Sequence, residues 1–306
     1  MTPSAFVSVV IPTLNRPSLV LRAVANALRQ TYERLEVIVV VDGPDAATIE
    51  TLSRLDESRL RIVPLPVNVG LAEARNSGIR AAAGDWVAFL DDDDEWHENK
   101  IEIQVAALGR DNSAINFSAC RYEERNSLTI RQMPRRFPDS NENWSEYIYV
   151  HGGVLLPSTY LVEKSLMLSM PFTKGLRYNE DADWLLRARV AGAIHPVWVD
   201  AVLATYHNEN EEERLSTTTP WEGRYQWLVE NRALLSPAAL PYYVARLCLP
   251  YARRSRSRFS ACALLLREAL RYGRLSLRSV CYLGAALFTR PEWRRRLRSR
   301  MDLNGR

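Results

Sequence analysis

Residues 68–96 read NVGLAEARNSGIRAAAGDWVAFLDDDDEW, and this run contains a helix, a strand and four adjacent carboxylates. Residues 71–83 have apolar side chains at helical spacing, and the pattern stops at Gly84, a residue typical of helix ends. Residues 86–90 form a short apolar strand that ends at Asp91. A helix that leads into a strand ending in polar residues is the repeating unit of α/β proteins. The segment therefore predicts an α/β fold with a polar site where its strand ends.

Short apolar strands and amphipathic helices also alternate on both sides of this segment. Strands are predicted at residues 6–11, 36–41, 60–64, 113–119, 196–199 and 202–206. Helices are predicted at residues 18–30, 44–55, 98–108 and 181–191, and from Trp221 to the end of the chain. This order indicates a mostly parallel sheet flanked by helices, because parallel strands need long crossover connections. We therefore expect an α/β domain over residues 1–220 and an arginine-rich helical region over residues 221–306.

Charge is distributed unevenly along the 306 residues, which carry a net charge of +4. From residue 231 onward there are 17 arginines, no lysine and three acids, so this region carries +14 and the rest carries −10. A basic region of this kind is expected to contact something anionic, such as a membrane surface or nucleic acid. No nucleic-acid-binding motif accompanies the charge, so we expect no nucleic-acid partner.

The compartment is predicted to be the cytoplasm. The four cysteines are far apart in the sequence, which favours reduced thiols over a disulfide framework or a zinc site. The first residues lack a basic segment followed by a long apolar stretch, so no signal peptide is predicted. No apolar run reaches the roughly 18 residues that a membrane-spanning helix needs.

Polar residues follow four of the predicted strands, and these clusters are expected to share one edge of the sheet. They are residues 12–16 after the first strand, Asp42 and Gly43 after the second, residues 68–70 and then Arg75 after the third, and residues 91–94 after the fourth. Ligands bind at the carboxyl ends of strands in open α/β sheets. Four adjacent carboxylates repel one another, and Mg²⁺ or Mn²⁺ would relieve that repulsion. The alternative is a solvated acidic turn, with Asp42 in a turn and Arg75 on the surface.

Four motifs in this order and spacing resemble glycosyltransferase family 2, whose members have the GT-A fold. The motifs are VSVVIPTLNRP, EVIVVVDGPD, NVGLAEARNSGIRAAAGDWVAFLDDDDEW and NEDADWLLRARVAG, and the resemblance covers roughly residues 5–210. It implies an inverting, metal-dependent enzyme that moves a sugar from a nucleotide diphosphate donor to a glycan or lipid-linked acceptor in cell-surface polysaccharide synthesis. It also implies that residues 1–112 form a nucleotide-binding half and residues 113–220 an acceptor half.

The resemblance assigns the donor site to residues that follow the first three strands. It implies that Asp42 accepts a hydrogen bond from the base, and that Arg75 reaches the same base. The other donor-site residues that it implies are Pro12, Thr13, Leu14, Asn15, Asn68 and Gly70. The family often has two acids before the glycine that follows the second strand, and here the first of them is Val41. Base contact then depends on Asp42 alone, which favours a uridine donor and leaves thymidine diphosphate sugars open.

Residues 91–93 occupy the position of the DxD motif of this family. The resemblance implies that Asp93 is a metal ligand and that Asp91 and Asp92 lie near the ribose or metal-bound water. The expected cofactor is a divalent cation, Mn²⁺ or Mg²⁺. Asp94 is expected to cap the helix that follows. His207 is expected to complete the metal or diphosphate site, and the alternative is a structural histidine.

Glu180 and Asp181 match the ED motif of the family, whose aspartate acts as general base. We therefore expect Asp181 to accept the proton of the acceptor hydroxyl, with Asp183 as the second choice. The alternative is that these acids only cap the helix that they precede. A single base opposite the leaving group implies one displacement and inversion at the anomeric carbon.

Two further regions are assigned provisional roles. Residues 141–159, which include Trp144, Tyr147, Tyr149 and His151, are expected either to shape the acceptor cleft or to pack in the core. Apolar segments at residues 242–251, 259–272 and 280–288 alternate with arginines, including clusters at 253–258 and 294–296. Amphipathic helices of this kind can lie in a membrane interface. We expect peripheral contact of residues 231–306 with the inner face of the cell membrane; the alternative is a helical subdomain or a homodimer interface.

Two other classes share parts of this pattern. A sugar nucleotidyltransferase normally has a glycine-rich basic loop after its first strand, and PTLNRPS contains no glycine. A phosphatase of the haloacid dehalogenase type has its DxD motif after the first strand, whereas here the acids follow the fourth. A non-catalytic nucleotide-sugar-binding protein would not need Asp181 together with Arg75 and the acids.

Overall fold

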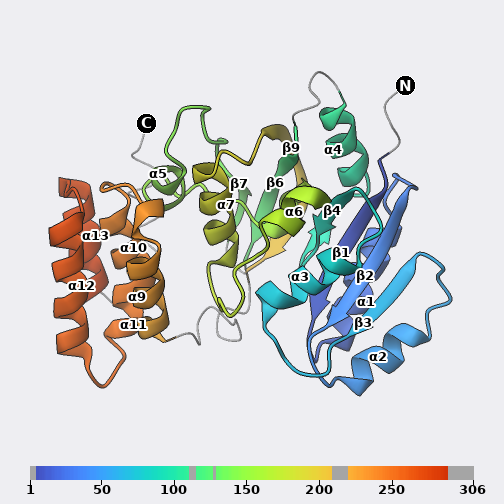
Figure 1. Cartoon of the computed structure of the whole chain (residues 1–306), viewed down its shortest axis with the longest axis horizontal. Coiled ribbons are helices and arrows are strands. Elements are labelled where there is room, and N and C mark those ends of the chain that lie inside the picture. Colours follow the sequence, from blue (N-terminus) through green and yellow to red (C-terminus); the bar gives the residue numbers. More distant parts are fainter. Residues whose placement is uncertain (1–4, 110–114, 127–128, 209–219, 289–306) are drawn as a thin grey trace. The chain divides into compact units, whose positions relative to one another are not determined.

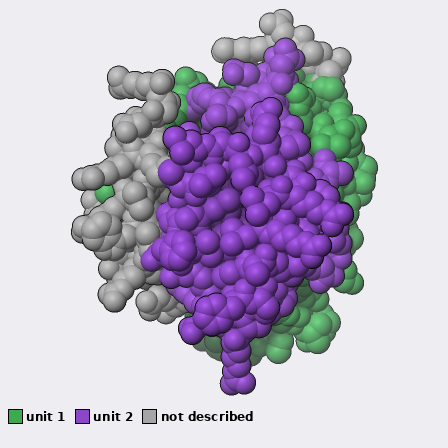
Figure 2. Space-filling model, turned by 90° about the vertical axis from the view of Figure 1, so that its left-hand side faces the viewer, with its two compact units in different colours: residues 1–135, 155–214 green, residues 136–154, 215–306 purple. Residues whose placement is uncertain are grey.

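The structure is a computed structural model, and it describes residues 5–109, 115–126, 129–208 and 220–288. The chain forms two compact units. The first unit comprises residues 1–135 and 155–214, and the second comprises residues 136–154 and 215–306, as coloured in Figure 2. The arginine cluster predicted at residues 294–296 lies outside the described residues.

A mixed sheet forms the centre of the first unit (Figure 1). Its strands are β1 (Val7–Thr13), β2 (Leu35–Val41), β3 (Leu60–Pro64), β4 (Trp86–Phe89), β5 (Glu95–Trp96), β6 (Phe117–Arg125), β7 (Ile130–Met133), β8 (Tyr160–Glu163) and β9 (Pro196–His207). The order is β3-β2-β1-β4-β8-β6-β9-β5, with β7 paired to β6. Strands β3, β2, β1 and β4 are parallel, whereas β8 pairs antiparallel with both β4 and β6.

The helices of the first unit connect these strands. They are α1 (Pro17–Leu28), α2 (Ala46–Ser53), α3 (Leu71–Ala81), α4 (Lys100–Leu108), the 3₁₀ turn η1 (Pro157–Thr159), α6 (Lys164–Ser169) and α7 (Glu180–Val190). Proline at the first position of α1 suits a helix start, because its missing N–H would have no partner there. The helices α1 and α3 both pack against β1 and β2.

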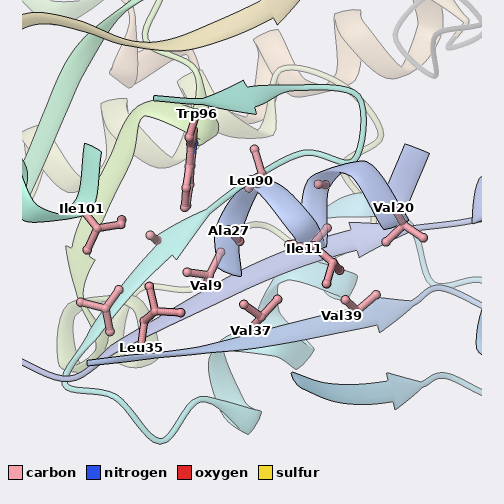
Figure 3. Close-up of a cluster of buried hydrophobic side chains, with 14 of the residues drawn as sticks. Val9, Ile11, Val20, Ala27, Leu35, Val37, Val39, Leu90, Trp96 and Ile101 are labelled. Atoms are coloured by element: carbon pink, nitrogen blue, oxygen red, sulfur yellow. The ribbon is translucent and has the colours of Figure 1, made fainter. Parts of the chain in front are cut away.

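Strands β1 and β2 are almost completely buried, as expected for β-branched strands covered on both faces. On one face, alternate residues of β1 and β2 such as Val9 and Val37 pack with Val20 of α1 and with Trp96 (Figure 3). On the other face α3 approaches β1 so closely that a Cβ added at Gly78 would collide with Val10. This packing fixes the carboxyl ends of the strands, where the polar clusters lie.

The second unit combines one internal segment with the C-terminal helices. Its elements are α5 (Trp144–Tyr149), α9 (Trp221–Glu230), η3 (Arg232–Leu234), α10 (Leu240–Tyr243), the π-helical turn η4 (Val244–Cys248), α11 (Leu249–Ala252), α12 (Arg258–Tyr272) and α13 (Leu277–Phe288). The ring of Tyr149 packs edge-on against Tyr243, and that of Trp227 stacks on Tyr243. Arginines also stabilise the interior: Arg224 lies over the ring of Tyr251 at 3.7 Å.

The predicted α/β fold with helices flanking a sheet is confirmed. Most predicted elements match within about two residues, but the two strands predicted at 196–199 and 202–206 form one strand, β9. It runs parallel to β6, and the register shifts on either side of Arg121. The division of the chain also differs from the expected one, because Arg136–Val154 belongs with the C-terminal helices.

Candidate active site

The ends of β1, β2 and β4 bring the predicted donor residues to one edge of the sheet. Thr13 is the last residue of β1 and pairs with Val41, the last residue of β2. The backbone N–H of Asp42 donates to the carbonyl of Thr13 at 2.9 Å. The Thr13 hydroxyl donates to Oδ2 of Asp92 at 2.7 Å, across 79 residues of sequence. Three of the polar clusters expected from the sequence therefore meet.

Arginines neutralise much of the acidic run, which comprises Asp91, Asp92, Asp93 and Asp94. Nη1 of Arg16 donates to Asp92 at 3.0 Å and to Asp93 at 3.3 Å. Nη2 of Arg75 donates to Asp91 at 2.6 Å. Burial raises the pKa of Asp92 to about 6, although the Thr13 hydroxyl and Arg16 act in the opposite direction. The repulsion on which the metal prediction was based is thus relieved in part by the protein itself.

Arg75 links the acidic run to α7. Its side chain is 1% exposed, and Nη1 donates to Glu180 at 2.7 Å while Nη2 contacts Asp91. The alternative that Arg75 is a surface residue is wrong. A buried guanidinium between two carboxylates is compensated on both sides, as a buried charge requires. The structure therefore ties the donor-side acids to the helix that carries the expected base.

Asp181 lies in the first turn of α7, next to Glu180. Burial and the Glu180 carboxylate raise the pKa of Asp181 to about 7, while Arg75 acts to lower it. An acid with such a pKa can accept a proton near neutral pH. Asp183 has a different role, because it is buried and accepts from Thr173 at 2.6 Å and from Arg187 at 2.9 Å. These bonds make Asp183 a structural residue and leave Asp181 as the candidate base.

Asp42 organises the loop that precedes α3. Its two carboxylate oxygens accept the backbone N–H groups of Val69 at 2.7 Å and Gly70 at 3.0 Å. Gly70 has φ +87°, a conformation that glycine adopts easily. Asn68 is exposed in the same loop. Contact of Asp42 with a base remains a prediction, and its observed bonds give it a structural role as well.

The loop after β1 has an organiser that the sequence reasoning missed. Oδ2 of Asp45 accepts the backbone N–H of Asn15 at 2.6 Å, and Oδ1 caps α2 by accepting from Thr48 at 3.1 Å. Asn15 itself has φ +55°, which asparagine tolerates better than most residues. The cap was detectable from an aspartate before a helical pattern, but the long-range bond was not.

Asp94 does not cap the following helix, because α4 begins at Lys100 with Asn99 at its N-cap. Instead Oδ2 of Asp94 accepts the hydroxyl of Ser158 at 2.5 Å. The same Ser158 oxygen accepts the backbone N–H of Asp91 at 3.2 Å, and Nε1 of Trp96 donates to the Ser158 carbonyl at 2.6 Å. Ser158 thus holds both ends of the acidic run from a separate turn, η1.

His207 is the last residue of β9 and contacts Glu95 at 3.2 Å. Arg22 also contacts Glu95 at 3.2 Å and donates to the carbonyl of Asp93 at 2.8 Å. Within the described residues, no group of three or more His, Cys, Asp or Glu side chains is arranged to hold a metal ion.

The aromatic residues proposed for the acceptor cleft are part of a core. Trp144, Tyr147 and Tyr149 are each less than 5% exposed and belong to the second unit. Gly153 has no room for a Cβ because the Tyr147 ring occupies that space. Core packing, the alternative considered for these side chains, is what the structure shows.

Residues 8–161 match the family described as Glycosyl transferase family 2. The chain belongs to this family. The match contains the acidic run, Asp42 and Arg75, and it ends before Asp181. The glycosyltransferase activity expected from the four motifs is thereby supported.

Relatives and solved structures agree with this assignment. The amylovoran biosynthesis glycosyltransferase AmsB of Erwinia amylovora is 28% identical over 209 residues, which cover 65% of this chain and 69% of that protein. WfgD of Escherichia coli, a UDP-Glc:alpha-D-GlcNAc-diphosphoundecaprenol beta-1,3-glucosyltransferase, is 32% identical over 124 residues, which cover 40% of this chain and 48% of that protein.

Two solved glycosyltransferases share the fold. S. aureus TarS, crystallised with UDP-GlcNAc, superposes with a TM-score of 0.59 at 18% identity, covering 92% of this chain and 79% of TarS. The mannosyltransferase PcManGT of Pyrobaculum calidifontis, in complex with GDP-Man and Mn²⁺, has a TM-score of 0.56 at 18% identity, covering 99% of this chain and 87% of its own. The expected GT-A fold is confirmed.

Proposed function

We propose that this glycosyltransferase moves a sugar from a UDP-sugar to a hydroxyl of a glycan or lipid-linked acceptor, with inversion, and that Asp181 is its general base. The observation that supports the proposal is the chain of contacts from Asp91 through Arg75 to Glu180, the residue that precedes Asp181 in the first turn of α7. A donor-side acid cluster and a carboxylate with a pKa of about 7 are the two groups that such a transfer needs.

The transfer then requires little from the protein beyond positioning and charge. The acceptor oxygen attacks the anomeric carbon while its proton passes to Asp181, and the bond from that carbon to the diphosphate oxygen breaks. The electron pair stays on the diphosphate. Because a single carboxylate acts on the side opposite the leaving group, the product has inverted configuration. The transition state is expected to resemble an oxocarbenium ion, as in glycoside hydrolysis.

The donor is proposed to lie along the ends of β1, β2 and β4. We assign its contacts to Asp42 and Arg75 and to the acids Asp91 and Asp92. The remaining donor residues are Pro12, Thr13, Leu14, Asn15, Asn68 and Gly70. UDP is favoured because WfgD uses UDP-Glc and TarS was crystallised with UDP-GlcNAc, whereas PcManGT was crystallised with GDP-Man. The donor screen therefore compares UDP-, GDP- and dTDP-sugars.

A divalent cation, Mn²⁺ or Mg²⁺, is proposed to accompany the donor. The acidic run offers hard carboxylate oxygens. Of the two carboxylates that Arg16 contacts, Asp93 is the more accessible, with its side chain 39% exposed. Magnesium sites in phosphate-binding proteins often use one or two carboxylates and take their other ligands from phosphates and water. We propose Asp93 as one ligand of this cation and His207, whose Nε2 lies 3.2 Å from Glu95, as another. Such an ion would neutralise charge on the leaving diphosphate.

The acceptor is proposed to be a membrane-associated, lipid-linked glycan at the inner face of the cell membrane. The name of WfgD states a diphosphoundecaprenol acceptor, and AmsB is named for amylovoran biosynthesis. No helix of the described residues is long and apolar enough to cross a membrane. Access to such a substrate would then depend on contact with the membrane surface.

Helices α12 and α13 of the second unit have the side chains for that contact. On α13, exposed residues recur at helical spacing and are apolar, with Leu277 and Phe288 83% and 85% exposed. On α12 the exposed positions include Phe259, Arg267 and Leu270. The one acid of these two helices, Glu268, pairs with Arg232 at 2.8 Å. Apolar and arginine side chains without exposed acids suit an anionic lipid surface.

The activity is tested by a donor screen. UDP-, GDP- and dTDP-sugars are incubated with the protein, an acceptor extract, and Mn²⁺ or Mg²⁺, and nucleotide release is measured. We expect release of UDP, its loss in chelator, and its loss in Asp181→Asn, whereas the exposed-site control Asp56→Asn stays active. Full transfer by Asp181→Asn would contradict the base assignment. Formation of a nucleotide sugar with release of pyrophosphate would indicate a nucleotidyltransferase instead.

Membrane contact is tested by pelleting the full chain with vesicles. We expect binding to phosphatidylglycerol vesicles, weaker binding at high salt, and little binding to phosphatidylcholine alone. Leu277→Ser combined with Phe288→Ser should reduce binding. The matched control is Ile130→Ser, an exposed apolar site on β7 of the first unit. Equal pelleting of both variants and the parent would contradict the membrane proposal. A concentration-dependent dimer without vesicle binding would favour a homodimer interface.

A further inference from the structure

The position of Arg16 is unusual for a positively charged side chain, because it contacts Asp93, the carboxylate proposed as a metal ligand, and the neighbouring Asp92. It lies between β1 and α1, at the N-cap of that helix. One nitrogen, Nη1, contacts both Oδ1 of Asp92 and Oδ2 of Asp93, at 3.0 and 3.3 Å. Its side chain is 38% exposed, whereas that of Arg75 is 1% exposed. The mechanism proposed above gives this residue no role.

A divalent cation at Asp93 would compete with Arg16 for the same oxygens. The pair Asp92 and Asp93 carries two negative charges when ionised, and Arg16 supplies one positive charge. A cation of charge +2 that used these carboxylates would leave the Arg16 charge without its partners. Like charges at short range repel strongly where water is partly excluded. Cation binding is therefore expected to release Arg16 from the acidic run.

We propose that Arg16 is a diphosphate-binding residue. In the donor-free enzyme it pairs with Asp92 and Asp93. When the donor and its cation bind, its side chain leaves these acids and contacts the donor diphosphate. This inference rests on the proposed donor site. A guanidinium suits the partner, because its planar donors match phosphate oxygens.

The other arginines around the acidic run are less able to move. Arg75 is 1% exposed and is held by carboxylates on two sides, Asp91 and Glu180. Arg22 is anchored in α1 and donates to a backbone carbonyl, that of Asp93. Within the described residues the Arg16 side chain pairs with Asp92 and Asp93 alone, and Pro17, where the helix begins, follows it. A rotation of its side chain would leave β1 and α1 in place.

The released charge has a use in the reaction. When the bond between the sugar and the diphosphate oxygen breaks, the electron pair stays on the diphosphate and its negative charge grows by one. A guanidinium that contacts the bound diphosphate stabilises the leaving group more than the ground state, because the negative charge it faces grows as the bond breaks.

The test uses binding measurements on the full chain and needs no turnover. Arg16→Gln removes the charge and keeps a polar side chain of similar length. Mn²⁺ binding without nucleotide, measured by electron paramagnetic resonance, should tighten by about threefold or more, because the competing charge is gone. UDP binding at saturating Mn²⁺, measured by calorimetry, should weaken by at least about threefold, because the released guanidinium no longer contacts the diphosphate. The matched control is Arg29→Gln, at the end of α1, whose contact with Glu98 is exposed and 3.8 Å long.

Opposite shifts of the two affinities distinguish this role from a structural one. If Arg16 only neutralised or positioned the acidic run, its loss would leave UDP affinity at saturating Mn²⁺ unchanged or would weaken both ligands, and either result would overturn the inference. Unchanged Mn²⁺ affinity would also overturn it. Arg16→Lys, which keeps the charge, should show Mn²⁺ affinity near that of the parent and serves if Arg16→Gln does not fold. If the protein binds Mn²⁺ as expected but binds no nucleotide, the proposed function is refuted. That result would still support competition between Mn²⁺ and Arg16 for the carboxylates of the acidic run.

Discussion

At the scale of single residues, Asp181 makes the sharpest prediction, because its pKa of about 7 is far above the 3.8 of an ordinary aspartate. A general base acts only when deprotonated, so kcat/KM should rise with pH through about 7 and level off above it. The measurement is a pH profile of UDP release at limiting donor. A flat profile between pH 5.5 and 8.5, roughly one and a half units on either side of that pKa, would show that another group accepts the proton.

The same shift has a consequence for stability. Because the folded state binds the Asp181 proton more tightly than the unfolded state, the stabilisation is complete below about pH 4 and is lost as pH rises through about 7. Asp181→Asn should therefore be more stable than the parent at pH 8, by roughly 1–2 kcal/mol after allowance for solvent screening. The difference should shrink toward pH 5. Thermal denaturation at both pH values measures it, and a variant less stable at pH 8 would contradict it.

Sequence motifs located the acidic run, Arg75 and Asp181, but they did not show how these residues are held. Among the partners of the acidic run, Arg75 and Ser158 lie 16 residues and at least 64 residues away along the chain from the residues they contact. Such pairs leave no periodic signal, because tertiary folding alone brings them together. The sequence also suggested that charge repulsion would demand a metal, whereas arginines supply part of the compensation.

At the scale of secondary structure elements, the turn η1 acts as a support for the strand β4 and the acids that follow it. Ser158→Ala removes a hydroxyl that contacts both Asp94 and the Asp91 backbone, at a cost of about 1–3 kcal/mol for buried groups that lose a partner. We expect kcat to fall about tenfold or more with a smaller change in donor KM, since the acids lose alignment. Ser158→Thr should restore part of the activity.

The matched control for this change is Ser165→Ala, at an exposed hydroxyl of α6 that contacts Glu163 at 2.7 Å. It should leave both kinetic constants unchanged. Equal kcat for Ser158→Ala and the parent would show that the acidic run keeps its geometry without this contact.

Two glycines in helices give opposite predictions. Gly78 of α3 packs against Val10 of β1 with no room for a Cβ, so Gly78→Ala should destabilise the protein by about 1–3 kcal/mol through overpacking. Gly284 of α13 has no heavy atom within 4 Å of its Cβ position, so Gly284→Ala should stabilise it by about 0.5–1 kcal/mol. Urea denaturation of both variants measures the signs, and a destabilised Gly284→Ala would mean that α13 is covered.

The elements themselves were predictable where the pattern was local. The strands β1, β2, β3 and β4 and the helices between them follow from apolar periodicity, because each is amphipathic or fully apolar over its whole length. The antiparallel return through β8 and the continuity of β9 were not predicted. Both depend on pairing between residues far apart in sequence, such as Phe117 with Val162 and with Pro196.

At the scale of the whole molecule, the second unit is assembled from two separate stretches of the chain. Helix α5 buries Trp144, Tyr147 and Tyr149 in that unit, and the remaining helices begin at Trp221. A chain that ends at residue 220 should therefore expose these aromatic side chains. We expect it to bind a hydrophobic dye and to show red-shifted tryptophan fluorescence relative to the full chain. A truncated protein that binds no dye would show that α5 finds other partners.

The boundary of the α/β domain was predicted close to residue 220, but the excursion of residues 136–154 was not. Residues 141–159 were predicted either to shape the acceptor cleft or to pack in the core, because local composition does not reveal which distant helices a short segment will join. From the sequence, the aromatic side chains of α5 could belong to a cleft as well as to a core. Their place in a core became visible only from the packing of Tyr149 on Tyr243.

The divided second unit also has a consequence during synthesis. Helix α5 ends at Tyr149 and its partner helices begin at Trp221, so the ribosome adds more than 70 residues before they emerge. At about 5–20 residues per second, this interval lasts roughly 4–14 seconds. During this interval, Trp144, Tyr147 and Tyr149 lack the helices that bury them in the complete chain. A nascent chain in that condition is a natural client for a holding chaperone, and slow codons between the two stretches would lengthen its exposure.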